Sequence, residues 1–360
     1  MKESPNVKFN CAYLLGGRVP HFEGTYAVHN PRVEFQEFMG RNITKAYDFS
    51  ALDLIKPSFL SKRLKPKVQF ALRCGRWRSS SNVSIASGED IGILCALYDV
   101  ITQSKNPMVI ITHGSYFGSK YWGQISRVLR TKTHIHWACL SNALAVSMVS
   151  DYGFSPGCVH SSGYGVDTEY FQPVAAFPSK PLILSAGTAN RDYKTLVSAV
   201  QGVNADVRIA ADSAWYPVET NLREVSLPSN ITVKSAGNYT GLRDLYAACH
   251  FVVVPMLPAR FACGYAVIAE AMAMGKTVIA TKTHSNSDFI KDGVNGFLVD
   301  VGDVDALRAR INYLLENPSV AARMGHLART EMEENWSLPA YTGRLEAAVK
   351  AASDLFSTSQ

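Results

Sequence analysis

The sequence predicts an α/β fold of two Rossmann-like doubly wound domains that face a cleft, followed by carboxyl-terminal helices. Three observations lead to this prediction. The chain has 360 residues, which is long for one hydrophobic core and sufficient for two. Short apolar runs bounded by turn residues alternate with helical patterns, as they do in parallel α/β sheets. The alternation pauses after Pro173 in a Pro-containing polar stretch and then begins again.

The first half of the chain contains five predicted strands. Each is a short run rich in apolar and β-branched residues, and most are separated by helical patterns. They fall at residues 7–15, 83–86, 108–112, 136–140 and 158–161. Between the first two, residues 41–82 show no clear alternation, and one or two helices are expected there. Together these elements predict an amino-terminal domain over residues 1–172.

The second half repeats the pattern with six predicted strands, at residues 182–186, 207–211, 231–235, 251–255, 277–281 and 296–299. From Asp303 onward the sequence is purely helical in pattern. A second Rossmann-like domain is therefore expected over residues 173–340, with a terminal helix over 341–360 that can pack back on the first domain. In such sheets ligands bind beyond the carboxyl ends of the strands.

Composition narrows the class of protein. Hydrophobic residues make up 47% and charged residues 18%, which is ordinary for a globular chain. The amino terminus lacks the layout of a secretory signal, and no apolar run has the length that spans a bilayer. A cytoplasmic protein is therefore expected.

The seven cysteines are scattered and never in CxxC spacing, which argues against a disulfide framework and a structural zinc site.

The positive charge is concentrated in one segment. The net charge is +6, and "KRLKPKVQFALRCGRWR" contains seven basic residues without an acid: Lys62, Arg63, Lys65, Lys67, Arg73, Arg76 and Arg78. Apolar residues lie between them, a mixture suited to peripheral contact with the inner face of a membrane or with an anionic acceptor. The alternative is a solvated helix face whose apolar residues pack on the domain. Nucleic acid is not an expected partner because no recognised binding module accompanies the patch.

A single acid stands out in the second half. Glu270 lies in "YAVIAEAMAMGKTVIAT", a helical pattern that is apolar on every face. A buried carboxylate is costly unless it is paired or hydrogen-bonded. Gly264 stands just before this helix, whose first N–H groups can receive a phosphate-sized anion. A ribose diol next to a diphosphate would satisfy the carboxylate, and a structural bond to nearby backbone or to an Arg is the alternative.

These motifs resemble those of GT-B retaining glycosyltransferases of the glycosyltransferase family 4 type, also called glycosyl transferases group 1. The resemblance rests on the Glu270 segment, on "DFIKDGVNGFLV", on "ACLSNALAVSMVSDYGFSPGCVHSSGYGVDTEYFQP" and on "SAGTANRDYKTLVSAV". It covers roughly residues 108–340. Several independent motifs in the right order are more specific than one glycine pattern.

The resemblance implies roles for residues of the second domain. Glu270 would bond the donor ribose, and the helix start would receive the diphosphate of a nucleotide-sugar donor. Arg191 and Lys194, after Gly187, would neutralise the departing diphosphate, so that no metal cofactor is needed. The nucleotide and sugar would be bound by Gly187, Asn238, Tyr239, Cys263, Gly264, Tyr265, Ala266 and Glu270. One departure concerns Ala262, which stands where the family commonly has a second glutamate that contacts the sugar.

In the first domain the resemblance points to His113 and to a glycine pair. His113 follows a predicted strand and would lie near the reacting sugar, although a lone histidine can equally be structural. Gly16 and Gly17 match a glycine loop near the donor phosphates, but any tight turn could use such a pair.

The implied activity is a hexosyltransferase that moves a sugar from a nucleotide diphosphate to a hydroxyl acceptor, such as a lipid-linked glycan, with retention of configuration. A non-catalytic nucleotide-sugar-binding partner and a sugar phosphorylase on the same fold are the alternatives.

Overall fold

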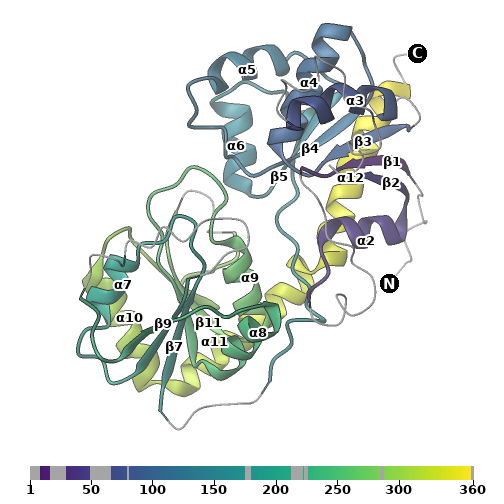
Figure 1. Cartoon of the computed structure of the whole chain (residues 1–360). Coiled ribbons are helices and arrows are strands. Elements are labelled where there is room, and N and C mark those ends of the chain that lie inside the picture. The colour runs from purple at the N-terminus through teal and green to yellow at the C-terminus, as the bar shows by residue number, and fades with distance from the viewer. Residues whose placement is uncertain are drawn as a thin grey trace. The chain divides into compact units, whose positions relative to one another are not determined.

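The computed structural model describes residues 9–16, 30–48, 66–78, 81–174, 180–211, 222, 226–283 and 288–357. The chain divides into two compact units. The first comprises Met1–Phe22, Val33–Gly163 and Tyr341–Gln360, and the second comprises Glu23–Arg32 and Tyr164–Ala340. Each unit is built on its own six-stranded sheet (Figure 1).

The sheet of the first unit is parallel throughout, with strand order β2-β1-β3-β4-β5-β6. The strands are β1 (Asn10–Leu14), β2 (Ile43–Tyr47), β3 (Val83–Ala86), β4 (Met108–Thr112), β5 (Ile135–Cys139) and β6 (Val159–Ser161). The prediction of all but β2 is confirmed, with ends shifted by up to three residues in β1. The strand order changes direction between β1 and β3, and such a switch point opens a crevice at the carboxyl ends of the strands.

Residues 41–82, where one or two helices are expected, contain one helix among the described residues and also a strand, β2, that the sequence did not predict. This part of the chain forms an edge strand that pairs with β1 alone, and then helix α3 (Pro66–Arg78). Lys45 and Ala46 are exposed, so the strand has no continuous apolar run. The sequence signal for a buried strand is therefore missing at this edge.

In the described part of the first unit, the helices of at least eight residues are α2 (Glu34–Arg41), α3, α4 (Glu89–Thr102), α5 (Trp122–Leu129), α6 (Asn142–Ser150) and most of α12 (Leu338–Ser357). A short 3-10 turn, Pro156–Cys158, precedes β6. Helices α3 and α4 cross closely at Gly75, where an added Cβ would lie 2.3 Å from the Tyr98 ring. This close approach fixes α3 against the body of the unit.

The sheet of the second unit is also parallel, with order β12-β11-β10-β7-β8-β9. The strands are β7 (Leu182–Ala186), β8 (Asp206–Ala210), β9 (Ile231–Val233), β10 (Phe251–Val254), β11 (Thr277–Thr281) and β12 (Gly296–Val299). All six predicted strands are confirmed. Read from β9, this is the Rossmann order, with its switch point between β7 and β10.

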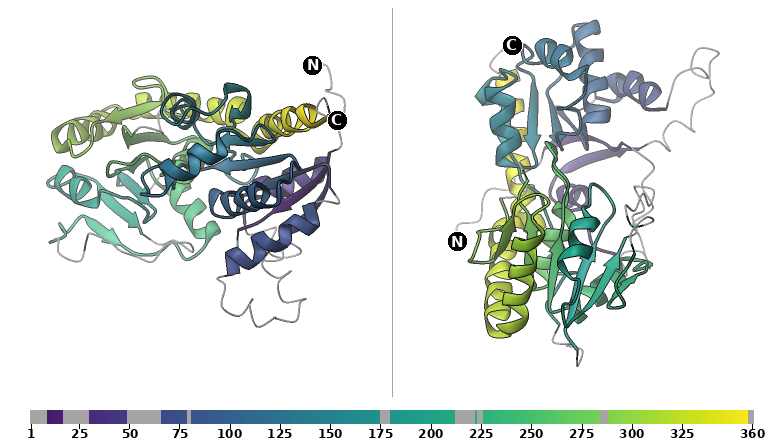
Figure 2. Two further views of the ribbon diagram at one scale, coloured as in Figure 1. Left: turned by 90° about the horizontal axis from the view of Figure 1, so that it is seen from above. Right: turned by 90° about the vertical axis from the view of Figure 1, so that its left-hand side faces the viewer.

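Helices cover both faces of this second sheet (Figure 2). The helices are α7 (Tyr193–Ala199), α8 (Tyr239–Ala248), α9 (Tyr265–Ala273), α10 (Val304–Glu316) and α11 (Pro318–Glu331), with a π-helical turn at Met332–Trp336. Helices α7 and α10 pack together over one core, which includes Ile209, Val253 and Ile279. Helices α9 and α11 pack against each other and against β11. Burial of apolar side chains on both faces of the strands explains why each reads as a short apolar run.

Within the described ranges, no helix combines the length and the apolar character needed to cross a membrane.

Candidate functional site

The loops that follow β7 and β10 are joined at the switch point of the second unit. The side-chain amide of Asn190 donates to the Leu257 carbonyl at 2.8 Å, and the Leu257 N–H donates to the Asn190 carbonyl at 3.1 Å. The Asp192 N–H donates to the Pro255 carbonyl at 3.0 Å. These bonds tie the two loops into one surface at the carboxyl ends of the strands, where ligands bind in this fold.

Arg191 lies buried beneath this surface, with 6% of its area exposed. Its Nε donates to the Ala186 carbonyl at 2.9 Å and its Nη1 to the Ala189 carbonyl at 2.8 Å. Burial lowers the pKa of the guanidinium. Among the described residues no carboxylate lies within ion-pair distance of it. The structure therefore places a buried cation whose protein partners are uncharged.

Two neighbours complete this loop. Gly187 has φ +91°, and a Cβ there would lie 2.6 Å from Nη2 of Arg191, so the glycine lets the guanidinium sit under the loop. The Thr188 hydroxyl is buried and has no hydrogen-bond partner among the described residues. Sequence reasoning missed Thr188, and its place directly after the strand-end glycine is the signal that could have found it. Lys194 is exposed in the first turn of α7.

Glu270 lies in α9 with 7% of its area exposed. The Tyr246 hydroxyl, on α8, donates to its Oε2 at 2.9 Å. Burial raises the pKa of Glu270 to about 7, and the bond from Tyr246 opposes this rise only in part. The carboxyl group is thus partnered by a neutral hydroxyl rather than by the backbone or Arg contact considered above.

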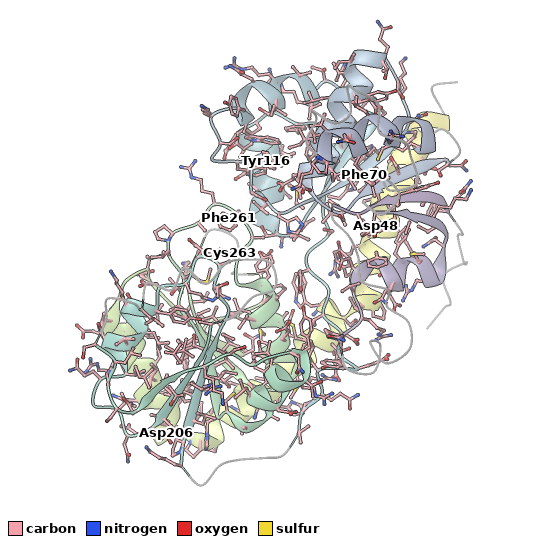
Figure 3. All side chains as sticks on the ribbon, viewed as in Figure 1. Asp48, Phe70, Tyr116, Asp206, Phe261 and Cys263 are labelled. Atoms are coloured by element: carbon pink, nitrogen blue, oxygen red, sulfur yellow. The ribbon has the colours of Figure 1, made fainter. Side chains whose placement is uncertain are left out.

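The start of α9 carries backbone donors without a side-chain cap. Gly264 is the N-cap residue, has φ +80° and offers no side-chain hydrogen bond. Cys263 before it is buried, and Tyr265 packs edge-on against Phe289 with ring centroids 4.7 Å apart. Figure 3 shows Phe261 and Cys263 in the loop that leads into this helix. Ala266 lies in its first turn. The helix start therefore has N–H groups available for an anion.

Asn238 and Tyr239, which the resemblance assigns to nucleotide-sugar binding, lie at the start of α8. Asn238 is the N-cap residue, and its Oδ1 accepts from the Gly241 N–H at 2.8 Å. The side chain of Tyr239 is 37% exposed. Asn238 thus caps the helix through its side-chain oxygen. Its side-chain nitrogen does not take part in this bond and can face a ligand.

In the first unit, the predicted His113 lies beside a carboxylate that sequence reasoning missed. Glu89 is buried and accepts from the Gly114 N–H at 2.8 Å, from the Ser115 N–H at 3.3 Å and from the Ser115 hydroxyl at 2.8 Å. Burial raises the pKa of Glu89, while the His113 charge and these bonds oppose the rise. The sequence did contain a signal for Glu89: it is an acid in the first turn of the helix that follows β3, at the switch point.

The glycine loop of the first unit lies at the same switch point. The Gly16 N–H donates to the Ser87 hydroxyl at 3.2 Å, and Nε2 of His113 lies 3.5 Å from the Ser87 carbonyl. These contacts bring the ends of β1, β3 and β4 together. Gly17 lies outside the described residues.

The basic segment is not the uniform patch that its sequence predicts. Arg78 is 1% exposed and forms a buried ion pair with Asp99, with Nη2 to Oδ2 at 2.9 Å. The prediction of a surface role for Arg78 is therefore wrong, because its charge is neutralised inside the unit. Lys67 is half exposed and pairs with Asp90, and Arg73 is partly exposed. Lys62, Arg63, Lys65 and the side chain of Arg76 lie outside the described residues.

Comparison with known proteins places these features in a family context. A family model described as glycosyl transferases group 1 matches residues 166–331, which is nearly all of the second unit. Alpha-maltose-1-phosphate synthase of Mycobacterium tuberculosis is 25% identical over 246 residues, covering 60% of this chain and 62% of that protein. MMP alpha-(1->4)-mannosyltransferase of Mycolicibacterium hassiacum is 27% identical over 206 residues, covering 55% and 49%. The matched segments thus span less than two thirds of these relatives.

Solved structures are similar over almost the whole chain. Sucrose-phosphate synthase from Thermosynechococcus elongatus has a TM-score of 0.72 at 16% identity, covering 97% of this chain and 100% of that one. Anabaena HepE in complex with UDP and glucose has a TM-score of 0.71 at 14% identity, covering 95% and 99%. At these identities the likeness shows a shared fold.

Proposed function

We propose that the protein transfers a hexose from a nucleotide diphosphate to a hydroxyl acceptor, because the glycosyl transferases group 1 model matches most of the second unit and the whole chain has the GT-B fold. The observation that carries the proposal is Glu270. It is a buried carboxyl group with one neutral partner, in the helix that begins beside the loop of the switch point. A ribose diol supplies the donors that such a carboxylate needs.

Other groups at the same switch point can bind the diphosphate. The uncapped start of α9 offers N–H groups and the positive end of the helix dipole. Arg191 adds a buried cation that has no carboxylate partner among the described residues, and the Thr188 hydroxyl adds a donor. Lys194 is exposed near the same loop and supplies a mobile charge. Stabilisation of the leaving diphosphate by these groups makes a bound metal unnecessary in the proposed reaction.

The names of relatives agree with this donor class. HepE has been solved with UDP, with UDP and glucose, and with UDP-glucose, and the Mycolicibacterium relative is named as a mannosyltransferase. The proposed reaction retains the anomeric configuration, with the departing phosphate accepting the proton of the acceptor hydroxyl on the same face of the sugar. His113, fixed beside Glu89 in the first unit, is proposed to contact the sugar or the acceptor.

The test is release of nucleotide from a donor panel of UDP-glucose, GDP-mannose and ADP-glucose. We expect one donor to release its nucleoside diphosphate, faster when a hydroxyl acceptor is present. Lys194→Gln should slow release by about 100-fold, because it removes a positive charge that stabilises the leaving diphosphate. Lys180→Gln is the matched control, since Lys180 is an exposed lysine that precedes β7, at the opposite end of that strand. Phosphate-dependent cleavage of a disaccharide without nucleotide would favour a phosphorylase instead.

Ala262 favours a second candidate, a non-catalytic nucleotide-sugar-binding partner. An alanine stands where the resembled enzymes commonly carry an acid that contacts the sugar. Ala262→Glu separates the two candidates. Gain of donor cleavage in this variant, with none in the natural protein, would identify a binding protein that has lost turnover. Loss of an existing activity would identify an enzyme whose sugar pocket is built around the alanine.

A further inference from the structure

Tyr246 is a fully buried tyrosine in the last turn of helix α8. Its side chain has no exposed area, and its ring packs edge-on against that of Phe171 with centroids 6.3 Å apart. At the end of this helix, Nζ of Lys276 donates to the carbonyls of Ala247 and Cys249 at 2.9 and 2.8 Å. A cation that donates to the last carbonyls stabilises a helix end. The tyrosine hydroxyl is therefore held in a fixed position within the second unit.

The two carboxyl oxygens of Glu270 are in different situations. Oε2 accepts the hydrogen bond from the Tyr246 hydroxyl at 2.9 Å, which joins α8 to the neighbouring α9 (Figure 1). Oε1 accepts no hydrogen bond from the residues that the structure describes. The residue keeps 7% of its area exposed. The described residues thus occupy one carboxyl oxygen and leave the other for a ligand.

The direction of the bond between Tyr246 and Glu270 is fixed by burial. Burial raises the pKa of the Tyr246 hydroxyl well above its ordinary value, and the negative charge of Glu270 raises it further, while the charge of Arg191 acts in the opposite sense. The hydroxyl therefore keeps its proton at neutral pH. A phenol has one proton to donate, and an ionised carboxylate can only accept. Tyr246 therefore holds Oε2 as a neutral donor.

We propose that Tyr246 is a positioning residue for nucleotide selection, which holds the carboxylate of Glu270 so that Oε1 is presented to the ribose hydroxyl groups. Without this bond the carboxylate can rotate about its last side-chain torsion, whose preferences are broad. An acceptor held in one place recognises a hydroxyl group at one place, and a rotating acceptor does not. The inference rests on the proposed function, since it requires a nucleotide diphosphate at this site.

An acceptor held in this way should distinguish ribose from deoxyribose. A site built to bond a hydroxyl group rejects an analogue that lacks it, because the buried polar group of the protein is then left unpaired. We expect the natural protein to bind the ribose nucleotide about 10- to 100-fold more tightly than a deoxy form, as is typical of a hydrogen bond to a charged group. Loss of the Tyr246 hydroxyl should reduce this ratio.

The test is calorimetric titration of the full chain with UDP, GDP and ADP, each also in its 2′-deoxy and 3′-deoxy forms. The quantity compared is the ratio of the dissociation constants of the deoxy and ribose forms. In Tyr246→Phe this ratio should fall by about fivefold or more for at least one of the two hydroxyl positions, which is the value of one ordinary hydrogen bond. Partial unfolding reduces the binding of both forms by the same factor, so the ratio reports positioning and not stability.

The matched control is Tyr152→Phe, because the Tyr152 hydroxyl also donates one hydrogen bond, to the Phe117 carbonyl at 3.0 Å, but in the first unit. Its ratios should equal those of the natural protein.

Glu270→Gln separates this inference from the proposed function. If Glu270→Gln removes the discrimination while Tyr246→Phe keeps it in full, the positioning role is overturned and the ribose site stands. If none of the nucleotides binds, or if Glu270→Gln leaves the discrimination unchanged, the proposed site is wrong and the inference is overturned with it.

Discussion

Glu270 shows how burial changes the pKa of a carboxyl group. With one neutral hydrogen bond from Tyr246, its pKa rises to about 7, because ionisation in an apolar helix is poorly solvated. Hydroxyl donors from a ribose would favour the ionised form. Binding is therefore expected to lower the pKa of Glu270 and to release a proton near neutral pH.

The first prediction concerns stability and the pKa of Glu270. The unfolded chain has the ordinary pKa near 4.5, so the folded state holds an extra proton between about pH 4.5 and 7. The free energy of unfolding is therefore highest below about pH 4.5. It falls by up to about 3 kcal/mol as the pH rises from there through 7. Glu270→Gln should lack this loss. Urea unfolding of both proteins from pH 5 to pH 8 measures it, and parallel pH profiles would contradict the assignment.

The second prediction concerns a histidine pair in the first unit. Nδ1 of His136 lies 2.8 Å from Nε2 of His160, and the rings stack with centroids 5.1 Å apart. Burial, with the charge of His160 as a smaller cause, lowers the pKa of His136 to about 4. Burial also lowers the pKa of His160. The folded state thus favours the neutral form of both histidines.

The sign of its pH effect is opposite to that of Glu270. Between about pH 6.5 and 4 the unfolded chain takes up protons that folded His136 does not, so the stability of the first unit falls as pH falls. His136→Gln should be less stable at neutral pH but should lose less stability on acidification. Calorimetry at pH 7 and pH 5 tests this, and an equal acid loss in both proteins would refute it.

Helix α3 is the element whose role changed most between sequence and structure. The guanidinium of Arg78 donates to Asp99 on α4, to the Ser84 hydroxyl at 2.7 Å and to the Asn106 carbonyl at 3.1 Å. One side chain therefore ties α3 to α4, to β3 and to the loop before β4. The end of α3 is held by a network inside the unit.

The third prediction tests that network. Arg78→Met leaves the Asp99 carboxylate buried without its cation, which should cost about 3–5 kcal/mol in the free energy of unfolding. Arg78→Met/Asp99→Leu should recover much of this loss, since it removes both charges. Arg41→Met is the control, because its partly exposed pair with Glu37 on α2 should be worth less than about 1 kcal/mol. A double variant no more stable than Arg78→Met would contradict the account.

Eleven strands could be predicted because parallel strands buried on both faces are short apolar runs between turns. The edge strand β2 could not, since Lys45 and Ala46 face solvent and interrupt the run.

The candidate site was found in part: Glu270 is conspicuous as one acid in an apolar helix. Its partner Tyr246 is 24 residues away, and the burial of Arg78 depends on Asp99, 21 residues away. Such pairings are set by packing and leave no local pattern.

At the scale of the whole molecule, each unit gathers its candidate groups at the switch point of its own parallel sheet. In the first unit, Gly16, Glu89 and His113 follow β1, β3 and β4. In the second, the Arg191 loop follows β7, and the α9 start follows β10. Under the proposed function the second unit binds the nucleotide diphosphate, and the first unit serves the sugar and acceptor.

The measurement that tests this account most directly is calorimetric titration with UDP, GDP and ADP. We predict that one of them binds, that Glu270→Gln weakens it on the order of 10- to 100-fold through loss of a charged hydrogen-bond acceptor, and that Asp244→Asn, an exposed acid on α8, leaves it unchanged. Absence of binding by all three, or equal affinity in Glu270→Gln, would contradict the assignment of this site to a nucleotide.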